Sequence, residues 1–394
     1  MRAIKARQVF DGERLLADGS VVLVDEGRIA GVQPGGTPLP GDCDVADFPG
    51  ATLLPGLIDA HVHLCADSGV GALDRLPDFS DEEMTAVIEN ALGVQLAAGV
   101  TTVRDLGDRR WAVIEWRDRN GRDAALPTVI GSGPPITSPK GHCWNMGGEA
   151  DGVTALRRAV QERADHGVDI VKIMASGGAN TPGSDASRPQ FTVEEIEAVV
   201  TEAHAAGLPV TAHAHALDAI RYALAAGVDA LEHCTFITET GIDVDDTVVA
   251  SLVEAAIPVC PTLGFVPGAQ PPPAVRELLR KAGSTNQSRP QIVAGLHHAG
   301  VRLVAGSDAG ISAGKPHGVL PESLIHLTDG GVSTREVIAS ATSIAAEACG
   351  LTGRKGRLVV GLDADLLLLD GDPLADITTL RNVEAVYVRG RRVV

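Results

Sequence analysis

The sequence lacks any long apolar run. Its 394 residues are 44% hydrophobic and 21% charged, as in a globular chain. No stretch reaches the roughly 18 uninterrupted apolar residues of a membrane span. The first ten residues, MRAIKARQVF, also lack the apolar core and cleavage site of a secretory signal. We therefore expect a soluble, cytoplasmic protein that folds from near Met1 and has no membrane partner.

Basic residues and paired cysteines are scarce as well. The chain has 33 Lys and Arg against 51 Asp and Glu, a formal net charge of -18. Binding to a phosphate backbone relies on clustered Lys and Arg, so nucleic acid is not expected as a partner. The six cysteines are scattered without a CxxC pair, at Cys43, Cys65, Cys143, Cys234, Cys260 and Cys349. Because this spacing gives neither a disulfide framework nor a zinc ribbon, we expect small buried side chains.

The two ends of the chain share a composition of short apolar runs and turn signals. Asp11-Gly12, Asp18-Gly19 and Glu26-Gly27 punctuate the first run of residues, and Gly371 to Pro373 divides the last. The length suits two or three ordinary domains or one large α/β barrel with an appendage. We expect residues 1–53 and 357–394 to pair into one small β-sandwich domain.

Between these ends, apolar runs alternate with amphipathic helical stretches. The runs are LLPGLIDAHVHL, TTVRDLG, PTVIGSG, VDIVKIMASG, LPVTAHAH, VDALEHC, IPVCPTL and VRLVAGSD. Helical periodicity fills most gaps, as in residues 81–99, 151–167, 192–207 and 216–227, each closed by a Gly that suits a left-handed cap. Eight strand–helix units predict an α/β fold, a (β/α)8 TIM-like barrel over residues 54–356. A Pro-rich loop, GFVPGAQPPPAV, lies near residue 270.

The predicted strands end in side chains that can bind metals. Two runs each close on a His-x-His pair, and alternate side chains of a strand point to one side, so either pair can present two imidazoles to one ion. In such a barrel the reactive groups lie at the carboxyl ends of the strands. Those ends here carry His61, His63, Lys172, His213, His215, His233 and Asp308. One such histidine alone is more often structural, but the whole set favours a metal site.

In these motifs the chain resembles the amidohydrolase superfamily. The matching segments, in order, are PGLIDAHVHL, VDIVKIMASGG, TAHAH, LEHC and GSDAG, and the closing GLDADLLLLDGDPL resembles the family's returning β-domain. The resemblance covers nearly the whole chain. The lysine followed by SGG is most similar to the binuclear branch that includes Xaa-Pro and related dipeptidases, close to imidazolonepropionase-like proteins.

The resemblance implies a site for two divalent metal ions. His61, His63 and Asp308 would hold one ion, and His213 with His233 the other. Lys172 would bridge them as a carbamate, formed when its neutral amine reacts with carbon dioxide; burial near a dicationic site favours the neutral amine. The alternative for Lys172 is an ion pair with an acid, which predicts a single metal. Nitrogen and carboxylate ligands suit Zn²⁺ best, with Mn²⁺, Fe²⁺ or Co²⁺ also compatible.

Such a centre predicts hydrolysis. Two adjacent ions share a bridging hydroxide and polarise a carbonyl at the same time. Asp308 would act as general base when the hydroxide attacks and as general acid toward the leaving amine. We expect a metal-dependent hydrolase that cleaves an amide (peptide-type) bond of a small substrate such as a dipeptide or N-acyl amino acid.

Four further residues are candidates for substrate binding. His142, in the Gly- and Pro-rich segment GPPITSPKGHCWNMGG, would bond the substrate carbonyl or developing oxyanion and so also act in catalysis. His215 shares a strand face with His213, but the family pattern needs one ligand there. Arg188 would pair with a substrate carboxylate, and His317 would line the pocket. For each of these the alternative is a structural or surface role, and Asp59 is assigned a structural role.

Two other functions stay open. The first is ring opening of a cyclic amide, as in imidazolonepropionase-like proteins, or a deaminase; deaminase-like members usually rely on one metal, so Lys172 weighs against that variant. The second is a non-catalytic scaffold, which the full set of ligand positions disfavours. A homo-oligomer is the prior for soluble enzymes of this size.

Overall fold

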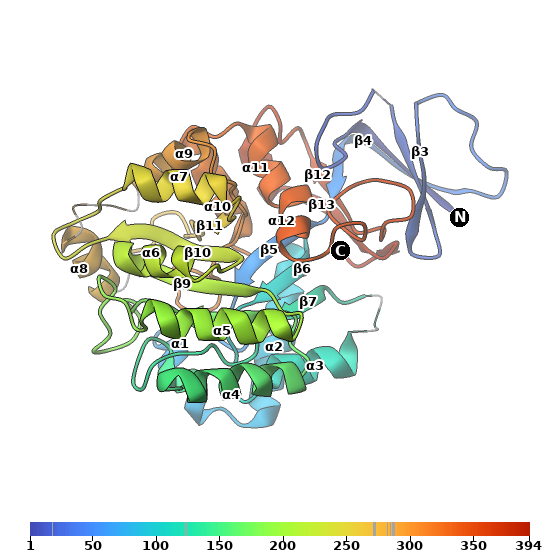
Figure 1. Cartoon of the computed structure of the whole chain (residues 1–394). Coiled ribbons are helices and arrows are strands. Elements are labelled where there is room, and N and C mark those ends of the chain that lie inside the picture. Colours follow the sequence, from blue (N-terminus) through green and yellow to red (C-terminus); the bar gives the residue numbers. More distant parts are fainter. Residues whose placement is uncertain are drawn as a thin grey trace.

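The chain forms a parallel β-barrel surrounded by helices, with a second sheet at one side of it (Figure 1). The computed structural model describes all residues except 18, 122, 124, 271, 272, 282, 284, 286 and 287. One residue of the predicted turn Asp18-Gly19 and two of the Pro-rich loop therefore lie outside the described residues.

The predicted barrel is confirmed. Its strands are β5 (Leu57–Val62), β6 (Val100–Asp105), β7 (Thr128–Gly131), β8 (Val171–Met174), β9 (Val210–Ala216), β10 (Ala230–Ile237) and β11 (Val259–Cys260). They form two parallel sheets, β5-β6-β7 and β8-β9-β10-β11. Parallel bridges close the ring: Ile136 to Ile173 joins the two sheets, and the segment after α9 bridges β11 at Leu303 and β5 at Ala309. The eighth predicted strand, residues 301–308, is thus held by bridges and is less regular than its neighbours.

Helices pack around the barrel. The α-helices are α1 (Ala72–Arg75), α2 (Asp81–Ala97), α3 (Ala112–Asn120), α4 (Gly152–Asp165), α5 (Val193–Ala205), α6 (Leu217–Ala225), α7 (Asp246–Glu254), α8 (Pro273–Lys281), α9 (Arg289–His298), α10 (Leu320–Asp329), α11 (Thr334–Ser340) and α12 (Ser343–Ala348). Short 3-10 turns are η1 (Leu76–Asp78), η2 (Trp144–Met146) and η3 (Ile377–Arg381). Each of the four predicted helices ends before its expected Gly, which adopts a positive φ of 67° to 83°. Capping boxes at Ser80 and Thr192 fix two of the helix starts.

The two ends of the chain share one sheet. Its strands are β1 (Arg2–Val9), β2 (Val21–Asp25), β3 (Arg28–Gln33), β4 (Asp44–Pro55), β12 (Leu366–Asp370), β13 (Val383–Val388) and β14 (Arg391–Arg392). The order β14-β13-β12-β4-β1-β2-β3 places the carboxyl-terminal strands beside the amino-terminal ones. Ile4, Leu53, Leu366 and Tyr387 belong to its apolar core. The residues at which this unit ends stay a prediction, since only Gly56 separates β4 from β5.

Membrane spans and disulfides are not found among the described residues. None of their helices is long and apolar enough to cross a membrane. All six cysteines are free, and five of them are buried, as predicted. Cys43 is instead partly exposed, because it lies at the edge of a small cluster formed by Ala3, Val21 and Leu23.

Candidate metal centre and active site

The predicted ligands meet in one cavity at the carboxyl ends of the barrel strands. His61 lies in β5 and His63 directly follows it, Lys172 lies in β8, His213 and His215 in β9, His233 in β10, and Asp308 in the irregular eighth segment. All of these side chains line the same cavity, together with His142. The structure therefore brings residues from five distant segments together, while their roles as ligands stay a prediction.

His61, His63 and Asp308 form one group. Asp308 Oδ1 lies 3.5 Å from His61 Nε2 and 3.4 Å from His63 Nε2. The other ring nitrogen of each histidine faces an acceptor: His61 Nδ1 is 2.7 Å from Glu232 Oε2 and His63 Nδ1 is 3.1 Å from the Gly107 carbonyl. Because these acceptors hold the ring proton on Nδ1, both Nε2 atoms keep a lone pair for a metal ion.

Glu232 supports this group and was not found from the sequence. Its buried carboxylate accepts hydrogen bonds from Arg104 Nη2 at 2.9 Å and Thr211 Oγ1 at 2.7 Å. Burial alone would raise its pKa, but Arg104 and His61 hold the pKa well below its usual range. An available signal was the position of Glu232 directly before His233, at a strand end where most neighbours are apolar.

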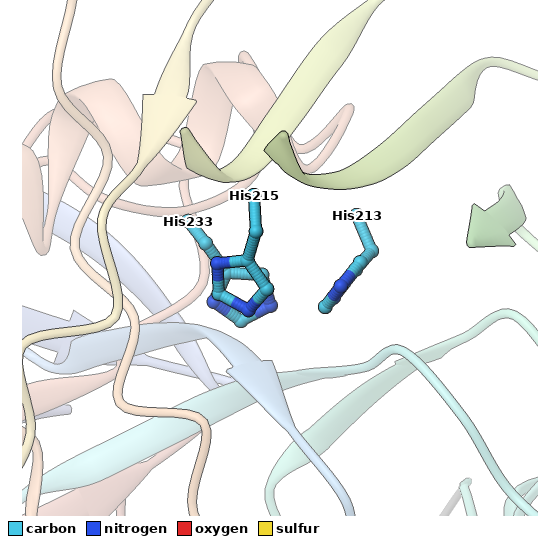
Figure 2. A group of neighbouring side chains, drawn as sticks. All are labelled: His213, His215 and His233. Carbon is cyan, nitrogen blue, oxygen red and sulfur yellow. The ribbon is translucent and has the colours of Figure 1, made fainter. Parts of the chain in front are cut away.

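His213, His215 and His233 form a second group, in which the three imidazole rings lie close together (Figure 2). Ring centroids are 4.5 Å apart for His213 and His215 and 4.6 Å apart for His213 and His233. His213 Nε2 donates to the Gly177 carbonyl at 3.1 Å, which leaves its Nδ1 as the free ligand atom. His233 Nδ1 is 2.8 Å from Thr262 Oγ1, so its Nε2 is free. One ligand atom from each histidine lies within 4.8 Å of the others, so His215 is close enough to join the ligands.

Lys172 is an orphan among these groups. Its Nζ is buried and has no hydrogen-bond partner among the described residues. Burial lowers the pKa of the amine, which favours the neutral form. A buried amine left unpaired carries a desolvation penalty, and a metal-bridging carbamate would remove it. Together with the ring nitrogens left free nearby, this orphan amine fits a site for divalent ions.

Most of the imidazoles are neutral near pH 7, as metal binding requires. Burial lowers the pKa of His61 and of His142 to about 4. It also lowers the pKa of His213 and of His233 well below the ordinary value. His63 differs: burial would lower its pKa, but the hydrogen bond and charge of Asp308 raise it.

The backbone is strained at two predicted ligands. His233 has φ 66° and Asp308 has φ 61°, in the left-handed region that non-glycine residues rarely adopt. Such conformations cost on the order of 1–3 kcal/mol and cluster at functional sites.

His142 reaches the cavity from the loop after β7. Its Nδ1 is 3.0 Å from Thr181 Oγ1, and that hydroxyl accepts from the Cys143 amide at 3.0 Å. The Thr181 hydroxyl can then donate its hydrogen to His142 Nδ1. The ring proton of His142 therefore lies on Nε2, which acts as a donor. Gly178 makes room for this ring, because a Cβ there would lie 2.5 Å from His142 Nε2.

Arg188 and His317 lie apart from the residues that line the cavity. Arg188 is exposed and pairs with Glu239 at 2.8 Å and with Asp185 at 3.4 Å, and its role in substrate binding stays a prediction. His317 is buried, and its Nε2 donates to the Ala66 carbonyl at 2.9 Å. Asp59 is buried beneath the site and accepts from the Ser307 amide at 2.9 Å, which fits its assigned structural role.

Two cations that line the cavity were missed from the sequence. Lys315 donates to the carbonyls of Thr262 and Ser307 at 2.9 Å, and its Nζ lies 3.4 Å from Asp308 Oδ2. Arg289 begins α9 and also lines the cavity. Lys315 lies in a turn and Arg289 at the start of a helix, and the spacing of residues does not show which way either side chain points.

The comparisons with known proteins agree with this geometry. Residues 52–393 match the model of the amidohydrolase family. The chain belongs to the amidohydrolase family. The resemblance inferred from the motifs is therefore confirmed, and with it the enzyme class of hydrolases acting on C–N bonds.

Relatives of the chain include proteins of several specificities. Ochratoxinase from Aspergillus niger is 27% identical over 369 residues, which cover 85% of this chain and 73% of that protein. Imidazolonepropionase from Salinispora arenicola is 26% identical over 379 residues, 91% of this chain and 88% of that protein. The crystal structure of a Xaa-Pro dipeptidase with bound methionine in the active site superposes with a TM-score of 0.86 at 27% identity and covers 99% of both chains.

Proposed function

We propose that this amidohydrolase is a metal-dependent enzyme that cleaves the amide bond of a dipeptide or N-acyl amino acid. One observation carries the proposal: two groups of free imidazole nitrogens, one with Asp308, meet around the orphan amine of Lys172 in a single cavity. The similarity to a Xaa-Pro dipeptidase over the full chain supports a peptide-type substrate.

The proposed ligands are His61, His63 and Asp308 for one ion and His213 with His233 for the other, with carbamylated Lys172 between them. Zn²⁺ suits these donors best, and Mn²⁺, Fe²⁺ and Co²⁺ are alternatives. Divalent ions held there would lower the pKa of bound water and polarise the substrate carbonyl.

In this proposal Asp308 transfers the proton and His142 stabilises the developing negative charge. Burial would raise the pKa of Asp308, but Lys315 and His63 hold it well below its usual range, so the carboxylate is ionised at neutral pH. It can accept the proton of the attacking water and deliver it to the leaving amine. His142, with Nε2–H as donor, would stabilise the negative charge that develops on the carbonyl oxygen.

Metal analysis and one substitution test the proposal. We expect close to two ions per chain, and Asp308→Asn should lower kcat at least about 10²-fold because it removes the proton acceptor. Circular dichroism of the variant should match the wild type. Retained turnover in the folded variant would contradict the assignment of the base.

A cyclic amide substrate is the second candidate, supported by the similarity to imidazolonepropionase. A screen of dipeptides, N-acyl amino acids and cyclic amides against zinc-loaded protein, read by amine or ammonia release, separates the two. Turnover confined to cyclic amides would replace the first proposal.

A further inference from the structure

Arg289 is a cation without an acid partner in the wall of the active-site cavity. Its Nη2 donates to the Pro261 carbonyl at 2.9 Å. Within the described part of the chain, no carboxylate lies within 4.0 Å of its guanidinium. Arg104, which is fully buried near the centre, instead pairs with Glu232 at 2.9 Å.

Of the other two cations that line the cavity, one belongs to the proposed metal ligands and the other is bonded within the protein. Lys172 lies among the proposed ligands, and Lys315 donates to two carbonyls and faces Asp308. Arg289 offers five N–H donors, and one of them makes a hydrogen bond within the described part of the chain. The guanidinium is thus a candidate site for an anion in the cavity wall.

Arg289 lines the same cavity as His215 and Asp308. Burial, together with the charge of Arg289, lowers the pKa of His215 to about 3. Burial also lowers the pKa of Arg289 itself to about 10, a value at which it stays charged at pH 7. A half-buried charge without a partner is unfavourable, and a carboxylate would supply two parallel hydrogen bonds to the planar fork.

The surroundings of Arg289 are apolar. Leu278 and Leu279 of α8 and Ile292 and Val293 of α9 line the same cavity. A group bound at the guanidinium would therefore place its adjoining side chain against an apolar wall.

We propose that Arg289 binds the free α-carboxylate of the amino acid on the leaving side of the scissile amide, whose apolar side chain packs against α8 and α9. This inference rests on the proposed amide hydrolysis. It assigns the substrate class as N-acyl amino acids and dipeptides with an apolar carboxyl-terminal residue. It also replaces Arg188 with Arg289 as the residue that pairs with the substrate carboxylate.

The test compares N-acetyl-L-leucine with N-acetyl-L-leucinamide, which differ only at the carboxylate, on the zinc-loaded full chain. A charge-assisted bidentate pair predicts a preference of about 10- to 100-fold in kcat/KM for the free acid. Arg289→Gln should abolish the preference mainly through KM, and Arg289→Lys should retain part of it. Arg280→Gln is the matched control, because Arg280 is exposed and pairs with Glu277.

Several outcomes would overturn the inference. Equal cleavage of acid and amide by the wild type would refute the carboxylate subsite while leaving amide hydrolysis intact. Loss of the preference in Arg188→Gln and not in Arg289→Gln would return the role to Arg188. A preference for N-succinyl-L-leucinamide that depends on Arg289 would move the carboxylate to the acyl side.

Calorimetry keeps the inference testable if neither compound is cleaved, an outcome that would count against the proposed function instead. N-acetyl-L-leucine should bind the wild type at least tenfold more tightly than it binds Arg289→Gln. Equal binding by the two proteins, or no binding by the wild type, would overturn the subsite.

Discussion

The two His-x-His pairs of the barrel have the same spacing but different neighbours. His61 and His63 lie against the carboxylates of Glu232 and Asp308. In the second pair, His213 bonds the Gly177 carbonyl and His215 Nδ1 lies 2.8 Å from Thr235 Oγ1. Within the described residues no carboxylate reaches either ring of this pair.

The difference shows that neighbours, and not the motif, set the charge and ligand strength of an imidazole. Asp308 raises the pKa of His63, whereas burial with other cations nearby lowers that of His213. A carboxylate on the far ring nitrogen also increases the basicity of the ligand atom. We therefore expect the first pair to bind its metal ion more tightly. The second pair would depend on the carbamate proposed for Lys172 as its negatively charged ligand.

The largest effect should come from removing a proposed metal ligand from the second His-x-His pair. His213→Asn removes the free Nδ1 and should leave about one ion per chain, with kcat at least about 10²-fold lower. His215→Asn is the matched variant, and we expect both ions to remain while KM rises. Metal content and steady-state kinetics of the two proteins check this. Loss of an ion in His215→Asn alone would exchange their roles.

A smaller effect should follow from removing the support of the first pair. Glu232→Gln keeps the shape of the side chain but weakens its bond to His61, so zinc affinity should fall by about 10- to 100-fold. Thr262→Val removes the corresponding partner of His233 and, because this partner is a neutral hydroxyl, should cost less than about tenfold. Zinc competition with a chelator measures both. Equal losses would mean that the carboxylate gives the first pair no advantage.

Stability must be followed in the Glu232→Gln variant. The substitution leaves Arg104 buried without its charged partner, and breaking a buried pair typically costs about 3–5 kcal/mol. Urea unfolding of the metal-free proteins separates this loss from the change in zinc affinity.

The sequence was sufficient for the features that depend on local pattern. The end of β5 at Val62, the end of β9 at Ala216 and the helix ends before Gly99 and Gly207 follow from periodicity and cap chemistry. The predicted ligands meet because parallel strands bring their carboxyl ends to one side of a barrel.

Features that depend on the path of loops or on pairing across the barrel were not predictable. Glu232 takes its partners from three other strands, at His61, Arg104 and Thr211. The sequence does not show which of Arg188 and Arg289 lines the cavity, because this depends on the fold. The irregular eighth segment likewise follows from tertiary packing around Asp308.

The subtlest test of the comparison is the order in which the pairs take up protons in metal-free protein. His63, with its pKa raised by Asp308, should titrate above the ordinary 6.5, while His213 should stay neutral well below it. Protonated His63 contributes stability that is present below pH 6.5 and lost as the pH rises through its folded pKa. The contribution of His213 to stability has the opposite sign. The unfolded chain takes up a proton on this histidine at a higher pH than the folded chain does, so stability falls as the pH drops below 6.5.

Nitrogen-detected NMR of the ring signals measures both pKa values, and Asp308→Asn should lower that of His63 alone. Coincident titration of the two histidines would show that the carboxylates do not distinguish the pairs.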